Sequence, residues 1–295
     1  MIEGIILLDK PPGQTSFQAL SHIKQKLGTR RVGHAGTLDR FAEGLLVVFA
    51  GRVTRLSGLA TAIDKEYVAT LTFGRQTDTL DPEGTVILEG PVPRKEDLEA
   101  VLPVFTGRVQ QVPPAYSAVH VVGGKRAYQA ARNGEKVVLA PREVIIHSLR
   151  LVSFTPPLAT LQVVCSKGTY IRSLARDLAA RLSTGAFVSN LRRTRIGGFR
   201  VEEAKSPGDF EPERDLLPPS RLFDASFGLH RLSLREEWQE KAASGAPIRD
   251  SFFLEPPVTD GVFGAFGNTG DLLAVLEKRG TSYRYTATFP RGEAS

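Results

Sequence analysis

One acid, Asp39, stands in the glycine-rich turn of the stretch GHAGTLDRFAEGLL, residues 33–46, just before an apolar run that is typical of a buried strand. Gly33 and Gly36 would let the backbone approach a ligand closely and would hold Asp39 at the mouth of a strand. His34 lies near, but no Cys or second His stands close enough in the sequence to complete a metal site or a triad. A turn acid that caps its own backbone is the common interpretation of such a pattern. A catalytic carboxylate is the alternative.

Three further residues are candidates to support such a carboxylate: Lys10, Tyr67 and Arg172. Strand periodicity most simply makes Tyr67 a half-buried residue on a strand face. Arg172 falls in the first turn of a predicted helix, where the helix dipole slightly disfavours a cation. An anionic partner therefore explains Arg172 better than solvent does, although a solvated arginine remains the alternative.

Basic residues cluster in LRRTRIGGF, residues 191–199. Arg192, Arg193 and Arg195 are typical of a solvated face, and contact with phosphates is the sharper interpretation. The chain has 38 Lys and Arg against 32 Asp and Glu, a net charge of +6. That balance makes a polyanionic partner plausible without identifying one.

Several classes of chemistry lack their usual motifs. The five His are scattered without metal-ligand spacing, and no phosphate-binding or dinucleotide-binding glycine loop is present. The single Cys165 excludes an internal disulfide and suits a reducing cytoplasm. The N-terminal apolar run is too short for a signal peptide, and no stretch is long enough to span a bilayer.

Apolar periodicity predicts the elements that must position these residues. Residues 4–9 are typical of a buried strand that a Pro-Pro-Gly breaker ends. A helix should follow, because Thr15 and Gln18 have the spacing of a capping box. Tyr67 belongs to a predicted alternating strand over residues 66–73. Further strands are predicted at residues 45–51, 144–154 and 160–165, and helices around residues 52–63, 94–105 and 170–182, the last with Thr169 as N-cap.

The 295 residues permit one large and one small domain. The Pro-rich stretch 207–219 interrupts the periodicity and marks the best boundary. Beyond it, β-like runs at 262–266, 272–276 and 283–289 surround one helix near 235–243. We therefore predict a large domain over residues 1–220 and a small β-rich module over residues 228–292.

The motif GHAGTLDRFAEGLL resembles the catalytic motif GHTGTLDPLATGVL of the bacterial tRNA pseudouridine-55 synthase family. Ala35 replaces a Thr, and Arg40-Phe41-Ala42-Glu43 replaces Pro-Leu-Ala-Thr, but the acid is retained. The module after residue 228 resembles that family's small PUA-like domain, so the resemblance spans nearly the whole chain. Further blocks match in the same order: LLDKPPGQTS, KEYVATLTFGRQTDTLDPEG, QVPPAYSAVHVVGGKRAYQAARNGE, CSKGTYIRSLARDL and LRRTRIGGF.

The resemblance implies an α/β (α+β) protein with the pseudouridine synthase fold, a mixed, largely antiparallel sheet flanked by helices. It implies isomerisation of uridine 55 in the T-loop of tRNA, a redox-neutral reaction that needs no cofactor or metal. Asp39 would act either as nucleophile toward the sugar or as the base that gives a glycal. Arg172 would favour its charged form and fix its orientation. Tyr67 would stack on the flipped base and accept its C5 proton.

The same resemblance implies a set of substrate-binding residues. His34 would fill or brace the space that the flipped base leaves, Leu191 would form an apolar wall of the uracil pocket, and Lys10 would have a structural or phosphate role. A thumb-like insertion at about residues 113–138 would close on the T-loop. Phosphate contacts are expected from Lys125, Arg126 and Arg132 in that insertion, and from Arg192 and Arg193.

The implied partner is tRNA, through its T-arm stem-loop, bound by a cytoplasmic monomer that requires no protein partner and no membrane. Two alternatives stay open. The archaeal and eukaryotic guide-RNA-dependent relative also uses the GTLD aspartate, but this chain has the thumb-like insertion and lacks long basic tails. A non-catalytic RNA chaperone that folds the T-arm is the other.

Overall fold

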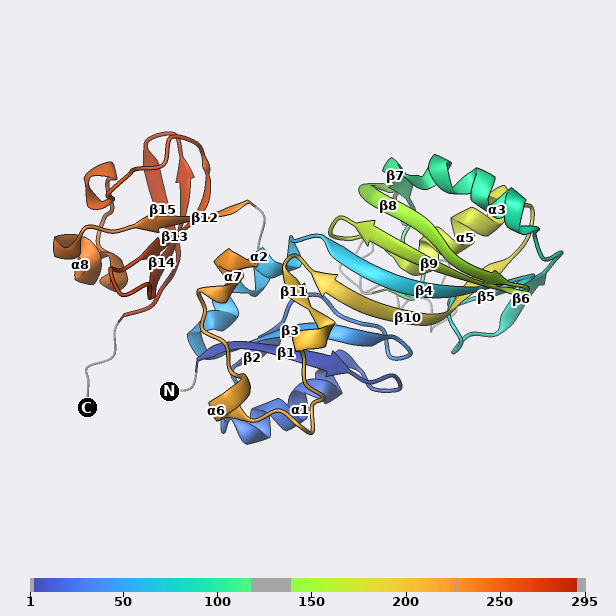
Figure 1. Cartoon of the computed structure of the whole chain (residues 1–295), viewed down its shortest axis with the longest axis horizontal. Coiled ribbons are helices and arrows are strands. Elements are labelled where there is room, and N and C mark those ends of the chain that lie inside the picture. Colours follow the sequence, from blue (N-terminus) through green and yellow to red (C-terminus); the bar gives the residue numbers. More distant parts are fainter. Residues whose placement is uncertain (1–2, 118–138, 226–227, 291–295) are drawn as a thin grey trace.

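The computed structural model describes residues 3–117, 139–225 and 228–290. Its body is a large sheet with the strand order β1-β3-β10-β4-β9-β8-β7, to which β2 and β11 add at β3 and β10 (Figure 1). Neighbouring strands are antiparallel except β3 and β10. The expected mixed, largely antiparallel sheet is confirmed. Its strands are β1 (Gly4–Lys10), β2 (Val32–His34), β3 (Glu43–Ala50), β4 (Lys65–Phe73), β7 (Gly107–Gln111), β8 (Arg142–Thr155), β9 (Leu158–Cys165), β10 (Ala186–Ile196) and β11 (Phe199–Arg200).

β1 and β3 are nearly continuous apolar runs because both faces of this part of the sheet are buried. α1 (Ser16–Lys26) covers one face with Ala19, Leu20 and Ile23. The predicted capping box at its start is confirmed, since the Thr15 hydroxyl accepts from the Gln18 amide at 3.2 Å and the Gln18 side chain accepts from the Thr15 amide at 2.8 Å.

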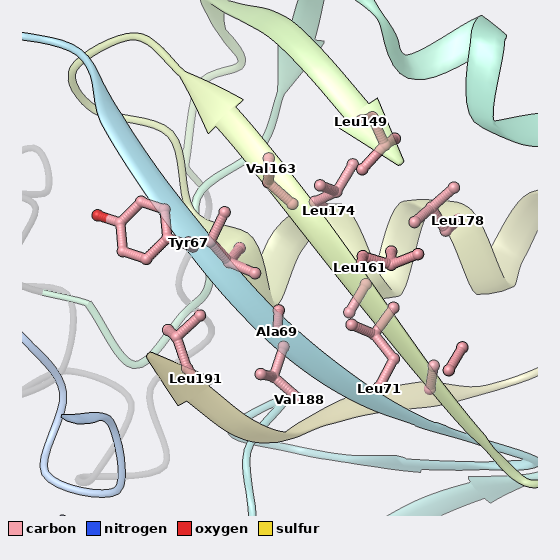
Figure 2. Packing of buried hydrophobic residues seen from close by; sticks show 14 of the residues in the cluster. Tyr67, Ala69, Leu71, Leu149, Leu161, Val163, Leu174, Leu178, Val188 and Leu191 are labelled. Atoms are coloured by element: carbon pink, nitrogen blue, oxygen red, sulfur yellow. The ribbon is translucent and has the colours of Figure 1, made fainter. Parts of the chain in front are cut away.

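β4 alternates buried and half-buried residues along its whole length, as predicted. Its inward side chains pack against α5 (Ile171–Arg181) in one apolar cluster (Figure 2). The predicted N-cap of α5 is wrong by one residue. Tyr170 occupies that position without a side-chain cap, and the Thr169 hydroxyl donates instead to the Ser166 carbonyl at 3.0 Å.

Short elements connect the large strands. The helix expected around residues 52–63 is a 3-10 turn, η1 (Gly51–Leu56), followed by α2 (Ser57–Thr61). The helix expected over residues 94–105 is α3 (Lys95–Val101) followed by η2 (Leu102–Phe105). Two strands that were not predicted, β5 (Arg75–Thr77) and β6 (Val86–Glu89), form a separate small sheet.

β10 crosses the middle of the sheet, with β3 on one side and β4 on the other. Arg193 lies opposite Tyr67, whereas Arg195 lies opposite Glu66, so one extra residue, Thr194, bulges out between them. The bulge leaves Leu191 and Arg193 on the face of Tyr67. It turns Arg195 to the opposite face.

The Pro-rich stretch 207–219 packs against the first sheet. Phe210 is fully buried beside α1, and the Leu217 and Ile5 main chains exchange two hydrogen bonds of 2.8 Å. A 3-10 turn, η3 (Val201–Glu203), precedes this stretch, α6 (Pro212–Asp215) lies within it, and α7 (Arg221–Asp224) follows it. The chain therefore stays on the first sheet through α7.

A second sheet of order β12-β13-β14-β15 follows, as the β-rich C-terminal pattern predicted (Figure 1). It shares an apolar cluster with the first sheet, in which Phe223 meets Phe266 edge to face at 5.6 Å. The division at residues 1–220 and 228–292 stays a prediction. The elements here are β12 (Leu229–Ser233), which was not predicted, η4 (Glu236–Trp238), α8 (Gln239–Ser244), η5 (Asp250–Phe252), β13 (Gly261–Phe266), β14 (Leu272–Arg279) and β15 (Ser282–Thr288). Within the described residues, no helix is long and apolar enough to cross a membrane.

Candidate active site

A cavity of about 500 Å³ opens where the loop after β2, strands β4 and β10, and the start of α5 meet. Segments far apart in the sequence therefore converge on one space. Six of the residues singled out from the sequence line it: His34, Asp39, Tyr67, Arg172, Leu191 and Arg193.

Asp39 and Arg172 form an ion pair in the wall of this cavity. The Arg172 Nε lies 2.9 Å from Asp39 Oδ2, and its Nη2 donates to Oδ1 at 3.1 Å. Only 5% of the arginine side chain is exposed, against 39% of the aspartate. Of these two contacts, the one from Nη2 to Oδ1 has hydrogen-bond geometry, whereas the Nε contact is an ion pair in which Nε makes no hydrogen bond within the described residues. The guanidinium thus lies against both carboxylate oxygens and restricts how the acid can turn. The anionic partner expected for Arg172 is therefore present.

Arg172 is itself fastened on its other side by Asp81. Its Nη1 donates to Asp81 Oδ2 at 3.0 Å and to the Thr79 carbonyl at 2.8 Å. Asp81 in turn accepts from the Thr79 hydroxyl at 2.6 Å and from the Glu83 amide at 3.0 Å. A fourth bond runs from Arg172 Nη2 to the Tyr116 carbonyl at 3.0 Å. Sequence reasoning did not single out Asp81, although it stands in the matching block KEYVATLTFGRQTDTLDPEG.

The electrostatics of Asp39 differ from the sequence expectation. Burial raises the pKa of its carboxyl, and the nearby Asp81 and Glu83 raise it further. The Arg172 cation lowers the pKa but does not reverse the direction. Arg172 thus fixes the position of the carboxylate. The surroundings as a whole nevertheless favour its ionised form less than water does.

Tyr67 closes the apolar side of the cavity. Its ring packs with Leu38 and Leu191, and 9% of the residue is exposed. Figure 2 shows it at the end of the cluster, with its hydroxyl pointing away from the other apolar side chains. Burial raises the pKa of this hydroxyl, while the Arg193 cation opposes that rise.

His34 lies on β2, at the cavity wall. Burial lowers the pKa of its imidazole, and the Arg193 cation lowers it further, so the ring is neutral at neutral pH. Its buried Nδ1 finds no hydrogen-bond partner within the part of the chain that the structure describes.

Lys10 is fully buried and does not line the cavity. Its ammonium donates to the carbonyls of Pro11 at 2.9 Å and Gln14 at 2.7 Å. Burial lowers the pKa of Lys10 to about 8. Of the two roles left open for it, these contacts support the structural one, because it shapes the loop that leads into α1.

The arginines of LRRTRIGGF are not a solvated face. Arg192 donates to both oxygens of Asp9, the shorter contact being 2.7 Å, and reaches Glu43 at 3.6 Å. Arg193 is 1% exposed, which argues against a surface phosphate contact, and its phosphate role stays a prediction. Arg195 pairs with Glu66 at 3.3 Å. Each of these guanidinium groups already donates to a carboxylate or a main-chain carbonyl.

Other residues of the cavity wall were not singled out. Lys65 is 6% exposed and donates to the Thr61 carbonyl at 2.5 Å, and burial lowers its pKa to about 8. The Arg142 guanidinium lies 4.6 Å from the centre of the Tyr170 ring. Lys65 and Tyr170 stand in matching blocks, but nothing in the sequence indicated Arg142. Lys125, Arg126 and Arg132, with most of the thumb-like insertion, lie outside the described residues.

No group of three or more His, Cys, Asp or Glu among the described residues is arranged to hold a metal ion. The described cavity offers a carboxylate held by an arginine, an aromatic ring and an apolar wall. That arrangement suits acid-base or nucleophilic chemistry on a flat, partly apolar group.

Comparison with known proteins shows the family of this chain. The model of the TruB family pseudouridylate synthase N-terminal domain matches residues 24–171. tRNA pseudouridine synthase B of Borrelia garinii subsp. bavariensis is 44% identical over 294 residues, covering 98% of this chain and 100% of that protein. Its counterpart in Thermobifida fusca is 38% identical over 299 residues, covering 98% and 99%.

Among solved structures, the Cbf5 chain of the archaeal box H/ACA sRNP Nop10-Cbf5 complex aligns with a TM-score of 0.74 at 22% identity. The alignment covers 98% of this chain and 87% of that one, and it supports the fold alone. Because the family model spans half of the chain and the relatives align over nearly all of it, this chain belongs to the TruB family of pseudouridylate synthases.

Proposed function

We propose that the protein isomerises uridine 55 in the T-loop of tRNA to pseudouridine. Family membership supports the reaction, and the observation that carries it here is the two-point contact of Arg172 with Asp39 at the edge of the cavity. The cavity, at about 500 Å³, falls within the usual size range of small-ligand sites, roughly 300–1,000 Å³.

The reaction breaks the bond between the sugar and N1 of uracil, rotates the base and joins the sugar to C5, which then loses its proton. No electrons are gained or lost. Asp39 acts either as nucleophile toward the sugar or as the base that removes a sugar proton to give a glycal, and both routes need its ionised form. Arg172 supports that form and holds the acid in one orientation.

Tyr67 and Leu191 are the proposed contacts of the flipped base. The tyrosine ring stacks on uracil, the leucine forms an apolar wall, and His34 fills the space that the base leaves. Extrusion costs a few kcal/mol of lost stacking, which these contacts offset. Because burial raises the pKa of Tyr67, its hydroxyl is protonated at neutral pH, and taking the C5 proton requires a group that favours the phenolate.

The partner we propose is the T-arm of tRNA, met by a cytoplasmic monomer that needs no protein partner. The net charge of +6 supports contact with phosphates. Phosphate contacts by Lys125, Arg126 and Arg132 remain proposals from the resemblance.

Tritium release from tRNA labelled at C5 of uridine tests the function. The purified protein should release tritium from a transcript with uridine at position 55, and the release should stop when that position carries cytidine. Release that persists with cytidine there points to another target uridine. Binding of both transcripts without release identifies an RNA-binding protein or chaperone in place of an enzyme.

A further inference from the structure

Arg193 lies at the crossing point of the strands that build the cavity. In β10 it sits opposite Tyr67 of β4 on one side and next to Gly44 of β3 on the other. Residues directly opposite each other on neighbouring strands have side chains on the same face, about 5 Å apart at Cβ. Gly44 has a φ of +102°, and a Cβ there would collide with the Arg193 backbone, so only glycine fits opposite Arg193.

The guanidinium of Arg193 is anchored by main-chain carbonyls. Its Nε donates to Leu45 at 2.7 Å, and its Nη2 donates to Gly36 at 3.0 Å. The Arg193 side chain is a buried cation, since the residue is 1% exposed. The groups that accept its described hydrogen bonds are uncharged carbonyls. Burying a charge without a carboxylate partner is costly, so a structural purpose alone would be served better by an apolar side chain.

These anchors leave the remaining amino group, Nη1, close to Gly36 and the cavity. Nη1 lies 3.6 Å from the position that a Cβ would take on Gly36. The cation acts on the groups around it, because it lowers the pKa of His34, Lys10 and Lys65 and opposes the rise in the pKa of Tyr67. The Tyr67 hydroxyl is thus the one proposed proton acceptor beside this fixed charge.

We propose that Arg193 is a positioning residue for the isomerisation, which acts through Tyr67 by holding a fixed cation against its hydroxyl. The assignment rests on the proposed function, since it concerns the step in which C5 loses its proton. A cation beside the hydroxyl stabilises the phenolate and directs one lone pair of the oxygen, so the oxygen presents its other side to the base. Arg193 itself touches no reacting atom.

A double-mutant cycle on the rate of tritium release tests the assignment. Arg193→Lys keeps the charge but loses the planar fork, and it should slow single-turnover release about tenfold or more while tRNA affinity stays within about threefold. In a Tyr67→Phe background the same substitution should change the rate by less than about threefold, because its target is gone. Equal losses in the two backgrounds would overturn the assignment.

Arg195→Lys is the matched control, since Arg195 lies two residues along the same strand and pairs with Glu66 on the opposite face. It should leave the rate and the Tyr67 signal unchanged. A loss equal to that of Arg193→Lys would mean that any arginine of β10 matters only for the stability of the strand, and would overturn the assignment too.

A second measurement reads the contact without turnover. In protein labelled with ¹³C at the tyrosine Cζ, the Tyr67 signal, assigned by its loss in Tyr67→Phe, should titrate at higher pH in Arg193→Met than in the wild type. An unchanged titration would overturn the assignment even if the enzyme is active. Should Arg193→Met fail to fold, the Arg193 Nη signals in the wild type should shift on Tyr67→Phe, and no shift would also count against it. Failure of the proposed function would appear instead as wild-type protein that releases no tritium.

Discussion

Arg172 forms ion pairs with Asp39 and Asp81 at the same time, with Nε 2.9 Å from the first carboxylate and Nη1 3.0 Å from the second. One guanidinium thus joins the loop before β3, the start of α5 and the turn after β5. Asp39 is the more exposed of the two acids, at 39% against 8%. The arrangement makes Asp81 an anchor and leaves Asp39 as the acid that a substrate reaches.

Asp39→Asn should abolish isomerisation while tRNA binding stays within about tenfold, or about 1.4 kcal/mol. The amide has nearly the same shape but neither attacks the sugar nor takes a proton. Tritium release and filter binding with the purified variant check both parts. Asp177→Asn, which alters an acid paired with Arg176 on the far part of α5, is the matched control and should keep wild-type turnover. Turnover in Asp39→Asn would remove Asp39 from the mechanism.

The rate should fall at the acidic end at a higher pH than an ordinary aspartate predicts. Burial raises the pKa of Asp39, so its carboxyl protonates and becomes inert above the usual 3.8. Arg172→Met removes the cation that opposes this shift, and the acidic limb should move to still higher pH. Single-turnover rates between about pH 4 and about pH 8 measure the acidic limb of the wild type and that of Arg172→Met. A limb that moves to lower pH in Arg172→Met would contradict the electrostatics described here.

The same shift has a consequence for folding. A carboxyl whose pKa is raised in the folded state binds its proton more tightly there, so its stabilising contribution is present below the unfolded pKa and is lost as pH rises through the folded pKa. The free energy of unfolding of the wild type should therefore decline as pH rises from the unfolded-state pKa of Asp39 to its folded-state pKa. Asp39→Asn should make that decline smaller. Urea unfolding of both proteins at about pH 4 and about pH 7 measures the difference.

Tyr67→Phe should keep base capture and lose proton transfer. The ring remains to stack on uracil, and only the hydroxyl is removed. If that hydroxyl takes the C5 proton, the variant should form the new bond and then accumulate an unaromatised adduct. A positioned general base contributes roughly 10²–10⁴ in rate, so single-turnover tritium release resolves the question. A rate within about threefold of the wild type would rule the hydroxyl out.

Phe210→Ala should destabilise the first sheet by about 3–5 kcal/mol, because this ring is fully buried beside α1. Phe17→Ala is the control on α1, since Phe17 is 68% exposed, and it should cost far less. Urea unfolding of the whole chain provides the measurement. Equal costs would mean that the Pro-rich stretch is not part of the first core.

Arg192→Ala should lower stability and leave the salt dependence of tRNA binding unchanged. Its guanidinium forms ion pairs with Asp9 and Glu43, so two carboxylates already neutralise the charge that a phosphate would need. Binding should still weaken linearly in the logarithm of salt, through other basic residues. A flatter slope in Arg192→Ala, measured by filter binding, would restore the phosphate role expected from the sequence.

The sequence predicts local features of this molecule well. The alternation along β4 and the capping box of α1 depend on residues within a few positions of each other, and both appear as expected. Thr169 shows the limit of such signals, because a good capping residue bonded the preceding turn instead. The resemblance, rather than periodicity, assigned Asp39, Tyr67 and Leu191 to one site.

Partners distant in the sequence were beyond prediction from local pattern. Arg192 and Arg193 were expected at the surface because charge carries no information about which carboxylate or carbonyl lies opposite. The partner of Arg192, Asp9, is 183 residues away, and the partner of Arg172, Asp81, is 91 residues away. Only the order of strands in the sheet brings these groups together.

The bulge at Thr194 determines which face of the sheet each side chain on either side of it takes. In an unbroken strand, Leu191, Arg193 and Arg195 would all face the cavity, and a second arginine would compete for the carbonyls that anchor the first. The extra residue turns Arg195 toward Glu66, so that Arg193 is the β10 arginine on the face of Tyr67. Shortening the strand here by one residue would thus be far more damaging than most single substitutions, because it would reverse the facing of every side chain on one side of the bulge.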